Sequence, residues 1–562
     1  MSDIVREIQV SLAHCLVWAL RAAGEKGLII KMDRVPDFTV EAPREKEHGD
    51  LATNLALLLA KPARMAPRRV AEILVQNLTR SLPWVEKIEI AGPGFINFYL
   101  QRDWVYQVIP SIIKKAENYG RVRLGKGRKV QVEFVSANPT GLLHMGNARG
   151  AALGDSIAAI LDFAGYAVTR EFYINDAGKQ IENFGLSLEA RYLQLLSREN
   201  RVPEDGYHGE DILESARGFL AREGDRYLAA SPDERRLALV EYALAEKIGS
   251  IKKVLADFGV HYDVWFSEQS LHEGGEVRDA LDYLQEKGCL YESEQALWFK
   301  ASEFGAEKDE VVVRANGIPT YFAADIAYHR NKFQRGFERV INVWGADHHG
   351  HVARMKGAVA ALGCDPDALD VVIMQLVRLY QGGEIVRMSK RTGQFVTLEE
   401  LVEEVGKDAA RYFFVMRGSD SHLDFDLDLA RSETNDNPVY YIQYAHARIC
   451  SILRQYGEQG GAMPEPADVD FKLLREEYEQ ALARKLADFP GEVTSAAVSL
   501  APQRMARYLH ELAGLLHSFY NSHRVITSPG ELTKARLLLV DATRITLKNG
   551  LGLLGLTAPE RM

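Results

Sequence analysis

The segment at residues 132–161, VEFVSANPTGLLHMGNARGAALGDSIAAIL, constrains the fold more than any other part of the chain. An apolar, β-branched run ends at Ser136, a turn containing Gly141 follows, and an apolar helical repeat begins near Gly146. In a doubly wound sheet, a strand-to-helix turn of this kind lies at the carboxyl edge, where ligands bind. Glycine lets the backbone approach a nucleotide, and the first N–H groups of a helix favour phosphate. The segment therefore predicts a nucleotide site, to which His144 adds a hydrogen-bond donor.

The phosphate-binding motifs of other folds do not occur at this turn. There is no GxxxxGK[ST] loop, and no GxGxxG follows the strand, so neither a Walker-type nor a dinucleotide site is indicated. The alternative that the segment leaves open is a glycine- and histidine-containing turn that only joins two elements.

Strand-like and helical patterns alternate from residue 121 to 385, which predicts a Rossmann-like, doubly wound parallel sheet. Its expected strands are VQVEFVS, VTREFYIN, RVINVWG and VVIMQLV. Residues 176–300 are charge-rich and are expected to form a helical insertion between the two halves of this α/β domain.

The flanking regions differ in pattern, and 562 residues are enough for about three or four domains. Residues 1–115 are expected to form an α+β domain, with a Gly-Pro-Gly turn at residues 92–94 between two strands. Residues 386–435 are expected to form a loop and stem-contact region. Residues 436–562 are expected to form an all-α bundle.

A second chemically distinctive segment is the loop at residues 382–401, GGEIVRMSKRTGQFVTLEEL, which carries Arg387, Lys390 and Arg391. Mobile cations of this kind can close on a triphosphate and stabilise charge as pyrophosphate leaves. A solvated basic loop is the alternative. The loop occurs together with the first segment in one α/β pattern, and this combination favours the nucleotide interpretation.

Composition excludes several classes of protein. The four cysteines are far apart and form no CxxC pair, so neither a disulfide framework nor a structural zinc site is suggested. No run reaches the roughly 18 uncharged apolar residues of a spanning helix, and the first residues read as an amphipathic helix, not a secretory signal. We therefore expect a cytoplasmic protein without membrane contact. The net charge of -10 neither indicates nor excludes nucleic-acid binding, because binding depends on where the basic residues cluster.

Two motifs give the chain a family resemblance. HMGN at residues 144–147 resembles the HIGH signature of class I aminoacyl-tRNA synthetases, and RMSKR at residues 387–391 resembles their KMSKS signature. More narrowly, the chain resembles bacterial arginyl-tRNA synthetases in several stretches spread over nearly its whole length. These are VEFVSANPTGLLHMGNARGAALGD, REFYINDAGKQI, PTYFAADIAYHRNKF, NVWGADHHGHVARMKGAV and VRMSKRTGQFVTLEELVEEVGKDAARYFF. Asn147 replaces the last histidine of HIGH, and Arg387 replaces the first lysine of KMSKS.

The resemblance implies a two-step ligase, which activates L-arginine with ATP and transfers it to the 3′ end of tRNA(Arg), releasing AMP and pyrophosphate. Mg²⁺ is expected to accompany ATP as a substrate complex, with no protein-bound metal. His144, Asn147, Arg387 and Lys390 are the implied catalytic residues. The implied ATP-binding residues are Gly141, Gly146, Gly345, Asp347, Met388 and Ser389.

A guanidinium substrate requires carboxylate acceptors and an aromatic face. Asp325 is the expected bidentate partner, with Tyr321 one helical turn away on the same face. Glu133, Asn138 and His348 are further candidates for arginine binding. An amphipathic helix with core aromatics is the alternative for the segment around Asp325.

His348, His349 and His351 also invite a metal interpretation. The cluster contains no cysteine, and its glycines suit a nucleotide edge better than a zinc site. We therefore expect these histidines to contact ATP or arginine.

The helical C-terminal region is expected to bind the anticodon stem and loop through basic and aromatic side chains, with Arg504, Arg507 and Tyr520 as candidates. The alternative is that the aromatics pack the bundle and the arginines are solvated. The resemblance implies that the N-terminal domain contacts the tRNA elbow. The sequence does not show the oligomeric state, and a monomer is expected only because the family is often monomeric.

Two competing functions are weighed against this one. Cysteine-specific relatives bind zinc through thiolates, and the valine, isoleucine and leucine enzymes carry a large editing insertion; both features are missing. A non-catalytic tRNA-binding protein is the second competitor, and the presence of Lys390 and the Gly146 turn argues against it.

Overall fold

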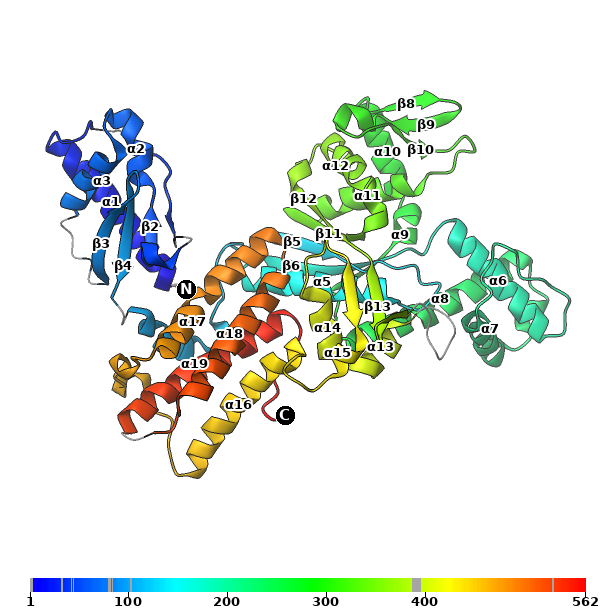
Figure 1. Ribbon diagram of the computed structural model, residues 1–562. Helices are drawn as coiled ribbons and strands as arrows, with labels where there is room; N and C mark the ends of the chain where they lie inside the picture. The colour runs from blue at the N-terminus through cyan, green and yellow to red at the C-terminus, as the bar shows by residue number, and fades with distance from the viewer. Residues whose placement is uncertain are drawn as a thin grey trace.

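The structure is a computed structural model of the 562-residue chain. It describes residues 4–31, 34–41, 43, 45–78, 82, 84–101, 104–386, 396–527 and 530–562. Figure 1 shows the blue N-terminal module beside the orange and red C-terminal helices, with the α/β region in the centre and helices α6 and α7 at the far end. The α/β region, which contains the central sheet, therefore lies between the terminal domains and helices α6 and α7.

The central sheet contains β5 (Lys129–Glu133), β6 (Ala167–Ile174), β7 (Val264–Ser267), β11 (Arg339–Gly345) and β12 (Leu369–Met374). Their order is β12-β11-β5-β6-β7, and every neighbouring pair is parallel. The chain runs from β5 to β6 and β7 on one side, and it later returns to β11 on the other side. This reversal puts the topological switch point between β5 and β11, where doubly wound sheets bind ligands.

The four strands expected from the sequence are confirmed as β5, β6, β11 and β12. Helix α5 (Met145–Phe163) follows β5 and packs closely against the end of this strand. Glycine at position 154 permits this packing, since a Cβ atom there would lie only 2.1 Å from Cγ of Phe134, the residue after β5. Helices α11 (Tyr321–Gln334) and α12 (His351–Ala361) flank β11 in sequence. These elements fix the start of α5 above the switch point.

The range expected to be a helical insertion is only partly helical. Helices α6 (Lys179–Leu195), α7 (Glu210–Glu223) and α8 (Pro232–Asp257) form a bundle with its own buried core, which includes Phe184, Tyr192 and Phe219. The same range then adds β7 to the central sheet, followed by α9 (Glu268–Glu273), α10 (Glu276–Glu286), β8 (Leu290–Ser293) and β9 (Ala296–Phe299). Strands β8 and β9 pair with β10 (Glu310–Val313) in a separate antiparallel sheet. Four-residue strands are too short to show a clear alternating pattern, so the expectation of helix missed them.

The N-terminal module packs helices against a four-stranded antiparallel sheet of order β1-β2-β4-β3. Its elements are α1 (Ile4–Glu25), β1 (Val40–Glu41), β2 (Leu51–Thr53), α2 (Leu55–Ala63), α3 (Pro67–Gln76), β3 (Val85–Ala91) and β4 (Phe95–Leu100). The expected turn at residues 92–94 joins β3 to β4. Gly94 has φ +145°, and a Cβ atom there would lie 2.8 Å from the carbonyl carbon of Pro67, so glycine is needed at this position.

The C-terminal bundle contains α16 (Pro438–Glu458), α17 (Glu477–Ser499), α18 (Gln503–Ser522) and α19 (Gly530–Leu553). Between it and the central sheet lie α13 (Leu398–Val405), α14 (Lys407–Val415), α15 (Leu427–Arg431) and a small sheet of β13 (Val377–Gln381), β14 (Glu384–Val386) and β15 (Leu423–Asp426). The remaining helix, α4 (Val108–Lys115), packs against α17 and α19. The expected all-α character of the C-terminal region is confirmed.

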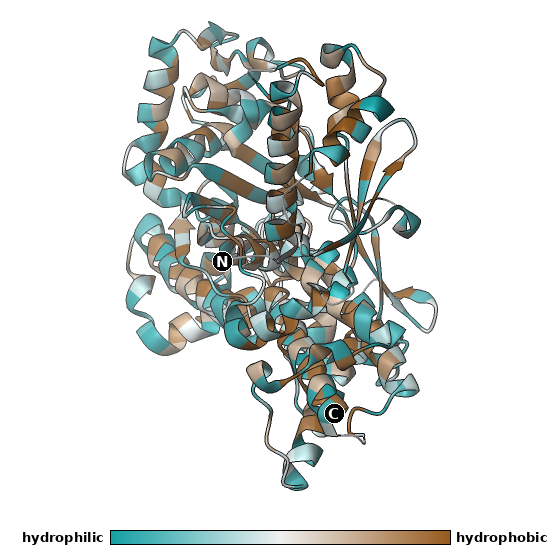
Figure 2. Cartoon of the chain, turned by 90° about the vertical axis from the view of Figure 1, so that its left-hand side faces the viewer, coloured by the Kyte–Doolittle hydropathy of each residue, from teal (hydrophilic) through white to brown (hydrophobic). Residues whose placement is uncertain are grey.

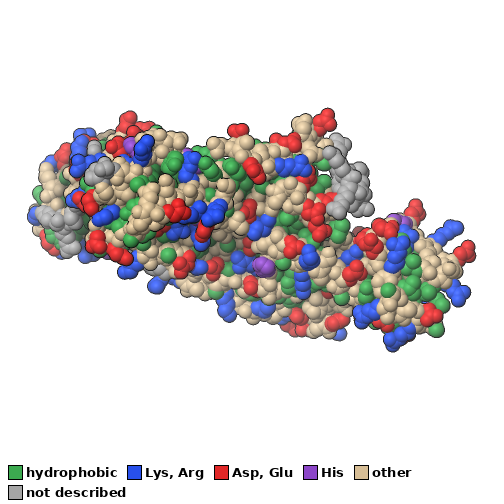
Figure 3. Space-filling view, turned by 90° about the horizontal axis from the view of Figure 1, so that it is seen from below, with side chains coloured by type: hydrophobic (Ala, Val, Ile, Leu, Met, Phe, Trp, Pro, Cys, Tyr) green, Lys and Arg blue, Asp and Glu red, His purple; other side chains and the backbone are tan. Residues whose placement is uncertain are grey.

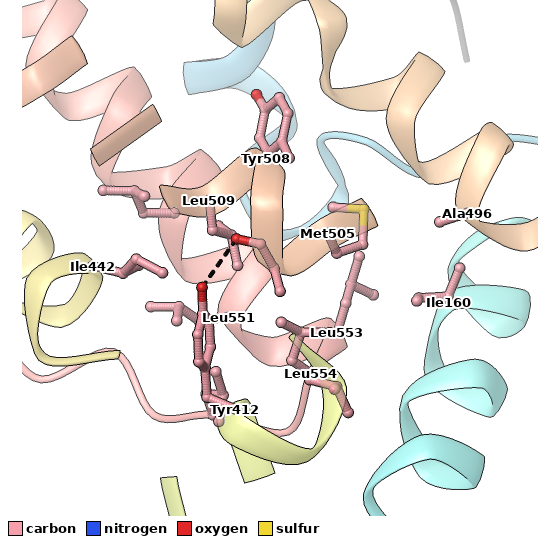
Figure 4. Close-up of a cluster of buried hydrophobic side chains, with 14 of the residues drawn as sticks. Ile160, Tyr412, Ile442, Ala496, Met505, Tyr508, Leu509, Leu551, Leu553 and Leu554 are labelled. Carbon is pink, nitrogen blue, oxygen red and sulfur yellow. Dashed lines mark hydrogen bonds between the residues drawn. The ribbon is translucent and has the colours of Figure 1, made fainter. Parts of the chain in front are cut away.

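A shared core attaches the bundle to the α/β region. Figure 4 shows Ile160 of α5 and Tyr412 of α14 among apolar side chains of the bundle, with a hydrogen bond of 3.3 Å from the Tyr412 hydroxyl to the Ala506 carbonyl. Arg411, fully buried, donates to the Leu554 carbonyl at 2.9 Å and pairs with Asp155 of α5 at 2.5 Å. Contacts of this kind hold the bundle in a fixed position relative to the switch point.

Hydrophilic and hydrophobic bands alternate along the helices in Figure 2, as expected for elements with one buried face. On the face seen in Figure 3, acidic and basic side chains are interspersed. Within the described ranges, no helix combines the length and apolar character needed to span a membrane.

Candidate active site

A cavity of about 660 Å³ lies at the switch point of the central sheet. Its walls come from the turn after β5, the start of α5, the end of β11 and the segment from β12 to β14. Five residues expected at the ATP site line it together: His144, Gly146, Asn147, Gly345 and Asp347. A volume of this size is typical of a small-molecule site.

Not every expected nucleotide residue lines this cavity. Gly141 lies in the exposed turn before α5, outside the lining. Arg387, Met388, Ser389, Lys390 and Arg391 fall outside the described residues. Residues on both sides of that segment, Ile385, Val386 and Val396, do line the cavity.

His144 and Asn147 cap the first turn of α5 reciprocally. The Gly146 N–H donates to His144 Nδ1 at 3.0 Å, and the His144 N–H donates to Asn147 Oδ1 at 3.0 Å. Because Nδ1 accepts, the proton of the neutral ring lies on Nε2, and burial lowers the pKa of His144 below its ordinary value. The site thus keeps a neutral imidazole with one N–H donor at the cavity wall.

The turn before this helix is strained. Val135 and Ser136 have φ +71° and +42°, in the left-handed region that a β-branched residue such as valine avoids. Ser136 Oγ donates to Glu133 Oε1 at 2.8 Å and accepts from the Tyr173 N–H at 3.3 Å. Strain of this kind concentrates at ligand sites, and Val135 lines the cavity.

Arg149 is a supporting residue that sequence reasoning missed. Its side chain, fully buried in α5, donates to the carbonyls of Gln375 at 2.7 Å and Gly418 at 2.9 Å. Burial lowers the pKa of this guanidinium to about 10. Arg149 therefore fixes Gln375, which lines the cavity, to the start of α5.

A second group of candidate residues adjoins the cavity. Asp325 lies on α11, and its Oδ2 lies 3.1 Å from His351 Nε2. The His351 ring lies 5.8 Å from the Tyr321 ring and 5.3 Å from the Trp344 ring, and Trp344 lies 6.1 Å from the His348 ring. Since Trp344 immediately precedes Gly345, the structure brings Tyr321, Asp325 and His348 next to this cavity.

A buried network of polar side chains holds the backbone carbonyl of Asp325. His329 Nδ1 donates to the Asp325 carbonyl at 2.7 Å, and its Nε2 accepts from Asn342 Nδ2 at 2.8 Å. Asn342 Oδ1 in turn accepts from Lys332 Nζ at 2.9 Å. Burial, followed by the charge of Lys332, keeps the pKa of His329 well below its ordinary value, so its ring is neutral.

Glu133 and Asn138 are already partnered. Glu133 Oε2 lies 2.5 Å from the fully buried Lys332 ammonium, and the glutamate is only 6% exposed. This pairing gives Glu133 a structural contact between β5 and α11, and its contact with arginine stays a prediction. Asn138 Nδ2 donates to Gln180 Oε1 at 2.6 Å, near the surface.

Glu268, at the start of α9, is a second acidic residue near Asp325 that the sequence did not reveal. It is 8% exposed, and α9 packs against α11. Burial, and then the nearby charge of Asp325, raise the pKa of Glu268 to about 7. A carboxyl group under this repulsion gains from the arrival of a cation.

Asp176 sets the position of Glu268. Its carboxylate accepts from Ser267 Oγ at 2.6 Å and from the Gln269 N–H at 2.9 Å, on either side of the glutamate. In the sequence, Glu268 lies in an ordinary helix start, and no motif relates it to Asp325, which is 57 residues away. Only the packing of α9 on α11 reveals the pair.

The three clustered histidines point to different partners. His351 is buried against Asp325, whereas His348 Nδ1 lies 3.2 Å from Asp347 Oδ2 and His349 is exposed. In the described residues, no group of three or more potential metal ligands comes together. The arrangement gives no support to a metal interpretation of this cluster.

The candidate tRNA-binding residues lie on α18 but have different neighbours. Arg504 pairs with Glu492 at 3.0 Å and Arg507 with Glu511 at 3.9 Å. Tyr520 instead stacks with Arg448 of α16, whose guanidinium lies 4.4 Å from its ring centre. The two arginines are thus paired with carboxylates, whereas the tyrosine is paired with a guanidinium.

A row of rings extends from Tyr520 along α16. Arg448 also lies 4.7 Å from the Tyr444 ring centre, and Tyr444 stacks on Tyr440 at 6.0 Å. Stacked tyrosines beside an arginine are a suitable platform for single-stranded bases. Tyr440, Tyr444 and Arg448 were not among the residues predicted to bind tRNA.

Comparison with family models identifies the class of protein that has this architecture. Residues 108–206 and 240–418 match the family model described as the catalytic domain of tRNA synthetases class I (R), so the sheet and its cavity are those of a class I aminoacyl-tRNA synthetase. Residues 11–100 match the arginyl tRNA synthetase N terminal domain, and residues 442–562 match the DALR anticodon binding domain.

Whole-chain comparisons agree with the domain matches. An arginine–tRNA ligase of Desulforamulus reducens is 64% identical over 562 residues, which is 100% of both chains. A solved putative arginyl-tRNA synthetase of Campylobacter jejuni is 33% identical with a TM-score of 0.75, covering 82% of this chain and 100% of that one. The Thermus thermophilus arginyl-tRNA synthetase is 25% identical with a TM-score of 0.71, covering 97% and 99%. The chain belongs to the arginyl-tRNA synthetase family, and the resemblance stated from its motifs is confirmed.

Proposed function

We propose that the chain is an arginine–tRNA ligase, which activates L-arginine with ATP and transfers it to the 3′ end of tRNA(Arg), releasing AMP and pyrophosphate. The observation that carries the proposal is the pair of carboxyl groups, Asp325 and Glu268, on the packed helices α11 and α9. His351 and Trp344 connect Asp325 to the end of β11 at the cavity. A planar cation with several N–H donors complements the two carboxyl groups, whereas a neutral side chain would leave the repulsion between them uncompensated.

Class I synthetases use ATP, and the chain's own residues explain how ATP would be held. In our proposal, His144 and Asn147 face the phosphates, Gly141 and Gly146 admit the nucleotide, and Gly345 and Asp347 meet the ribose. The caps at the start of α5 leave the His144 Nε2–H and the Asn147 amide as donors. Such preformed donors stabilise charge as it develops on the phosphates.

The basic loop completes the phosphate site in this proposal. Arg387 and Lys390, with Met388 and Ser389 between them, would close over the β- and γ-phosphates. Mg²⁺ would enter with ATP as part of the substrate complex, where it neutralises phosphate charge.

For arginine, we propose that Asp325 and Glu268 receive the guanidinium while the exposed Tyr321 ring covers it. Asn138 and His348, nearer the nucleotide, would bind the α-amino and carboxylate groups. Holding arginine beside the α-phosphate turns the first step into a reaction between aligned groups.

For tRNA, we propose that the C-terminal bundle holds the anticodon stem and loop and that the N-terminal module contacts the elbow. Arg504 and Arg507 would contact phosphates, whereas Tyr520 would stack on bases with Tyr444 and Tyr440. The proposed reaction places the enzyme in the cytoplasm, with ATP and tRNA, and we propose that it acts as a monomer.

The experiment is to charge total bacterial tRNA with each labelled amino acid in turn, with ATP and Mg²⁺ present. Attachment of arginine alone supports the proposal. Attachment of another amino acid would not affect the fold assignment, but it would overturn the assignment of Asp325 and Glu268 to arginine binding. The D325A variant should then raise the KM for arginine far more than the KM for ATP, and equal changes in both would contradict the assignment.

A further inference from the structure

His351 lies where the proposed arginine site and the nucleotide cavity meet. It begins α12, is 5% exposed, and contacts three rings: Tyr321 at 5.8 Å, Phe322 at 5.4 Å and Trp344 at 5.3 Å. Its one polar contact in the described ranges is with Asp325 Oδ2, 3.1 Å from Nε2. The ring is therefore held by aromatic packing and directed at a single carboxylate oxygen.

The contacts define the tautomer of this histidine. Since a carboxylate oxygen accepts, His351 Nε2 must carry the proton. Nδ1 is buried and has no hydrogen-bond partner among the described residues. His351 is thus the donor in this contact, and Asp325 Oδ2 is the acceptor.

Asp325 depends on this contact for the orientation of its carboxylate. Its backbone carbonyl is fixed by His329, but in the described part of the chain the carboxylate itself has no hydrogen-bond donor other than His351. The donor occupies Oδ2 from one side, which sets the plane of the group and leaves Oδ1 for an incoming N–H. A planar guanidinium requires such a fixed acceptor plane more than a rotating ammonium group does.

We propose that His351 is a positioning residue for substrate specificity, which orients Asp325 for the guanidinium of arginine. The inference rests on the proposed function of this site. His351 acts through Asp325 and does not itself contact the reacting atoms. Its aromatic contacts also join Tyr321 to Trp344, so the ring of Tyr321, the carboxylate of Asp325 and the end of β11 keep one relative arrangement.

The test compares substitutions that keep or remove the donor at Nε2. H351Q places an amide N–H at a similar distance along the side chain, H351N is too short to reach, and H351L removes the donor. ATP–pyrophosphate exchange in the presence of tRNA gives the KM for arginine and the KM for ATP. Loss of a hydrogen bond to a charged group predicts that H351L raises the KM for arginine by about ten- to a hundredfold while the KM for ATP changes by less than about twofold. H351Q should recover most of this loss.

A packing control separates positioning from stability. F299L removes ring contacts to Phe304 and Phe322 in the same core and touches neither His351 nor a polar group, so its melting temperature should fall while its KM for arginine stays near that of the wild type. If H351L does not fold, the comparison of H351Q with H351N decides the question on the same readout. Equal KM values for arginine in H351Q and H351N, or equal rises in both KM values, would overturn the inference. Wild-type enzyme that fails to charge arginine would overturn the proposed function instead.

Discussion

The Lys332 ammonium lies 2.5 Å from Glu133 Oε2, and the side chain of Lys332 is fully buried and that of Glu133 almost so. Removing one partner of such a pair leaves a buried charge uncompensated, at a cost of about 3–5 kcal/mol. The pair joins α11, which carries Asp325, to strand β5, which leads into the cavity. The contact with Lys332 predicts a structural role for Glu133, which a variant can test separately from arginine binding.

We expect E133Q to lower the melting temperature of the catalytic domain markedly while changing the KM for arginine by less than about threefold. The reason is that Lys332 loses its counter-charge, whereas Asp325 keeps both His329 and His351. Calorimetry and exchange kinetics measure the two effects. The double variant E133Q/K332M should recover much of the lost stability. A large rise in the KM for arginine with no change in melting temperature would instead return Glu133 to the arginine site.

Glu268 predicts a pH dependence of arginine binding. Its pKa is raised to about 7 in the free enzyme, and guanidinium binds the ionised form, so a protonated Glu268 must release its proton when arginine binds. The KM for arginine should therefore rise as pH falls below about 7, by up to about tenfold per unit. E268Q should raise the KM at pH 8 and flatten this dependence. The KM for ATP is the internal control, and a wild-type KM for arginine that stays constant from pH 8 to 6 would contradict the assignment.

The same carboxyl group predicts a stability cost. Folding raises the pKa of Glu268 from 4.5 to about 7, so the folded state binds this proton more strongly than the unfolded state. Proton binding at Glu268 therefore stabilises the folded state fully below about pH 4.5. This stabilisation is lost as pH rises through about 7, and the loss amounts to about 3 kcal/mol of unfolding free energy at pH 8. E268Q, a neutral mimic, should therefore melt higher than the wild type at pH 8, and the difference should shrink at pH 6. A lower melting temperature at pH 8 would show that the buried charge is compensated.

The sequence predicted the elements of the fold where periodicity and turn chemistry are strong. The strand, turn and helix of residues 132–161 follow from periodicity and turn residues, and they border the cavity. The positive φ values of Val135 and Ser136 do not follow from residue type, because a β-branched residue avoids them. The strands β7, β8 and β9 were not anticipated, since four residues carry too little alternation to distinguish them from a charge-rich helical region.

The supporting residues of the site depend on contacts between distant segments. Glu268 meets Asp325 across 57 residues of sequence, and Arg149 reaches Gln375 and Gly418 across more than 200. Such residues look like ordinary helix residues in a single sequence. His351 was visible as a histidine near ATP or arginine, but its turn inward to Asp325 depends on the packing of α12 against α11.

Asn147, which departs from the family signature, has two separable roles in the structure. Its Oδ1 accepts from the His144 N–H at 3.0 Å and caps α5, and its amide group is left to donate into the cavity. N147D keeps the cap acceptor and adds a negative charge that the helix N-terminus favours, so its melting temperature should equal or exceed that of the wild type. The same charge would face the ATP phosphates, so the KM for ATP should rise about tenfold or more. N147A loses the cap, and we expect a cost of about 1 kcal/mol together with a lower kcat, because His144 loses its fixed backbone. If N147D keeps the wild-type KM for ATP, the residue serves only as a cap, and the phosphate role falls to His144 and the loop at residues 387–391.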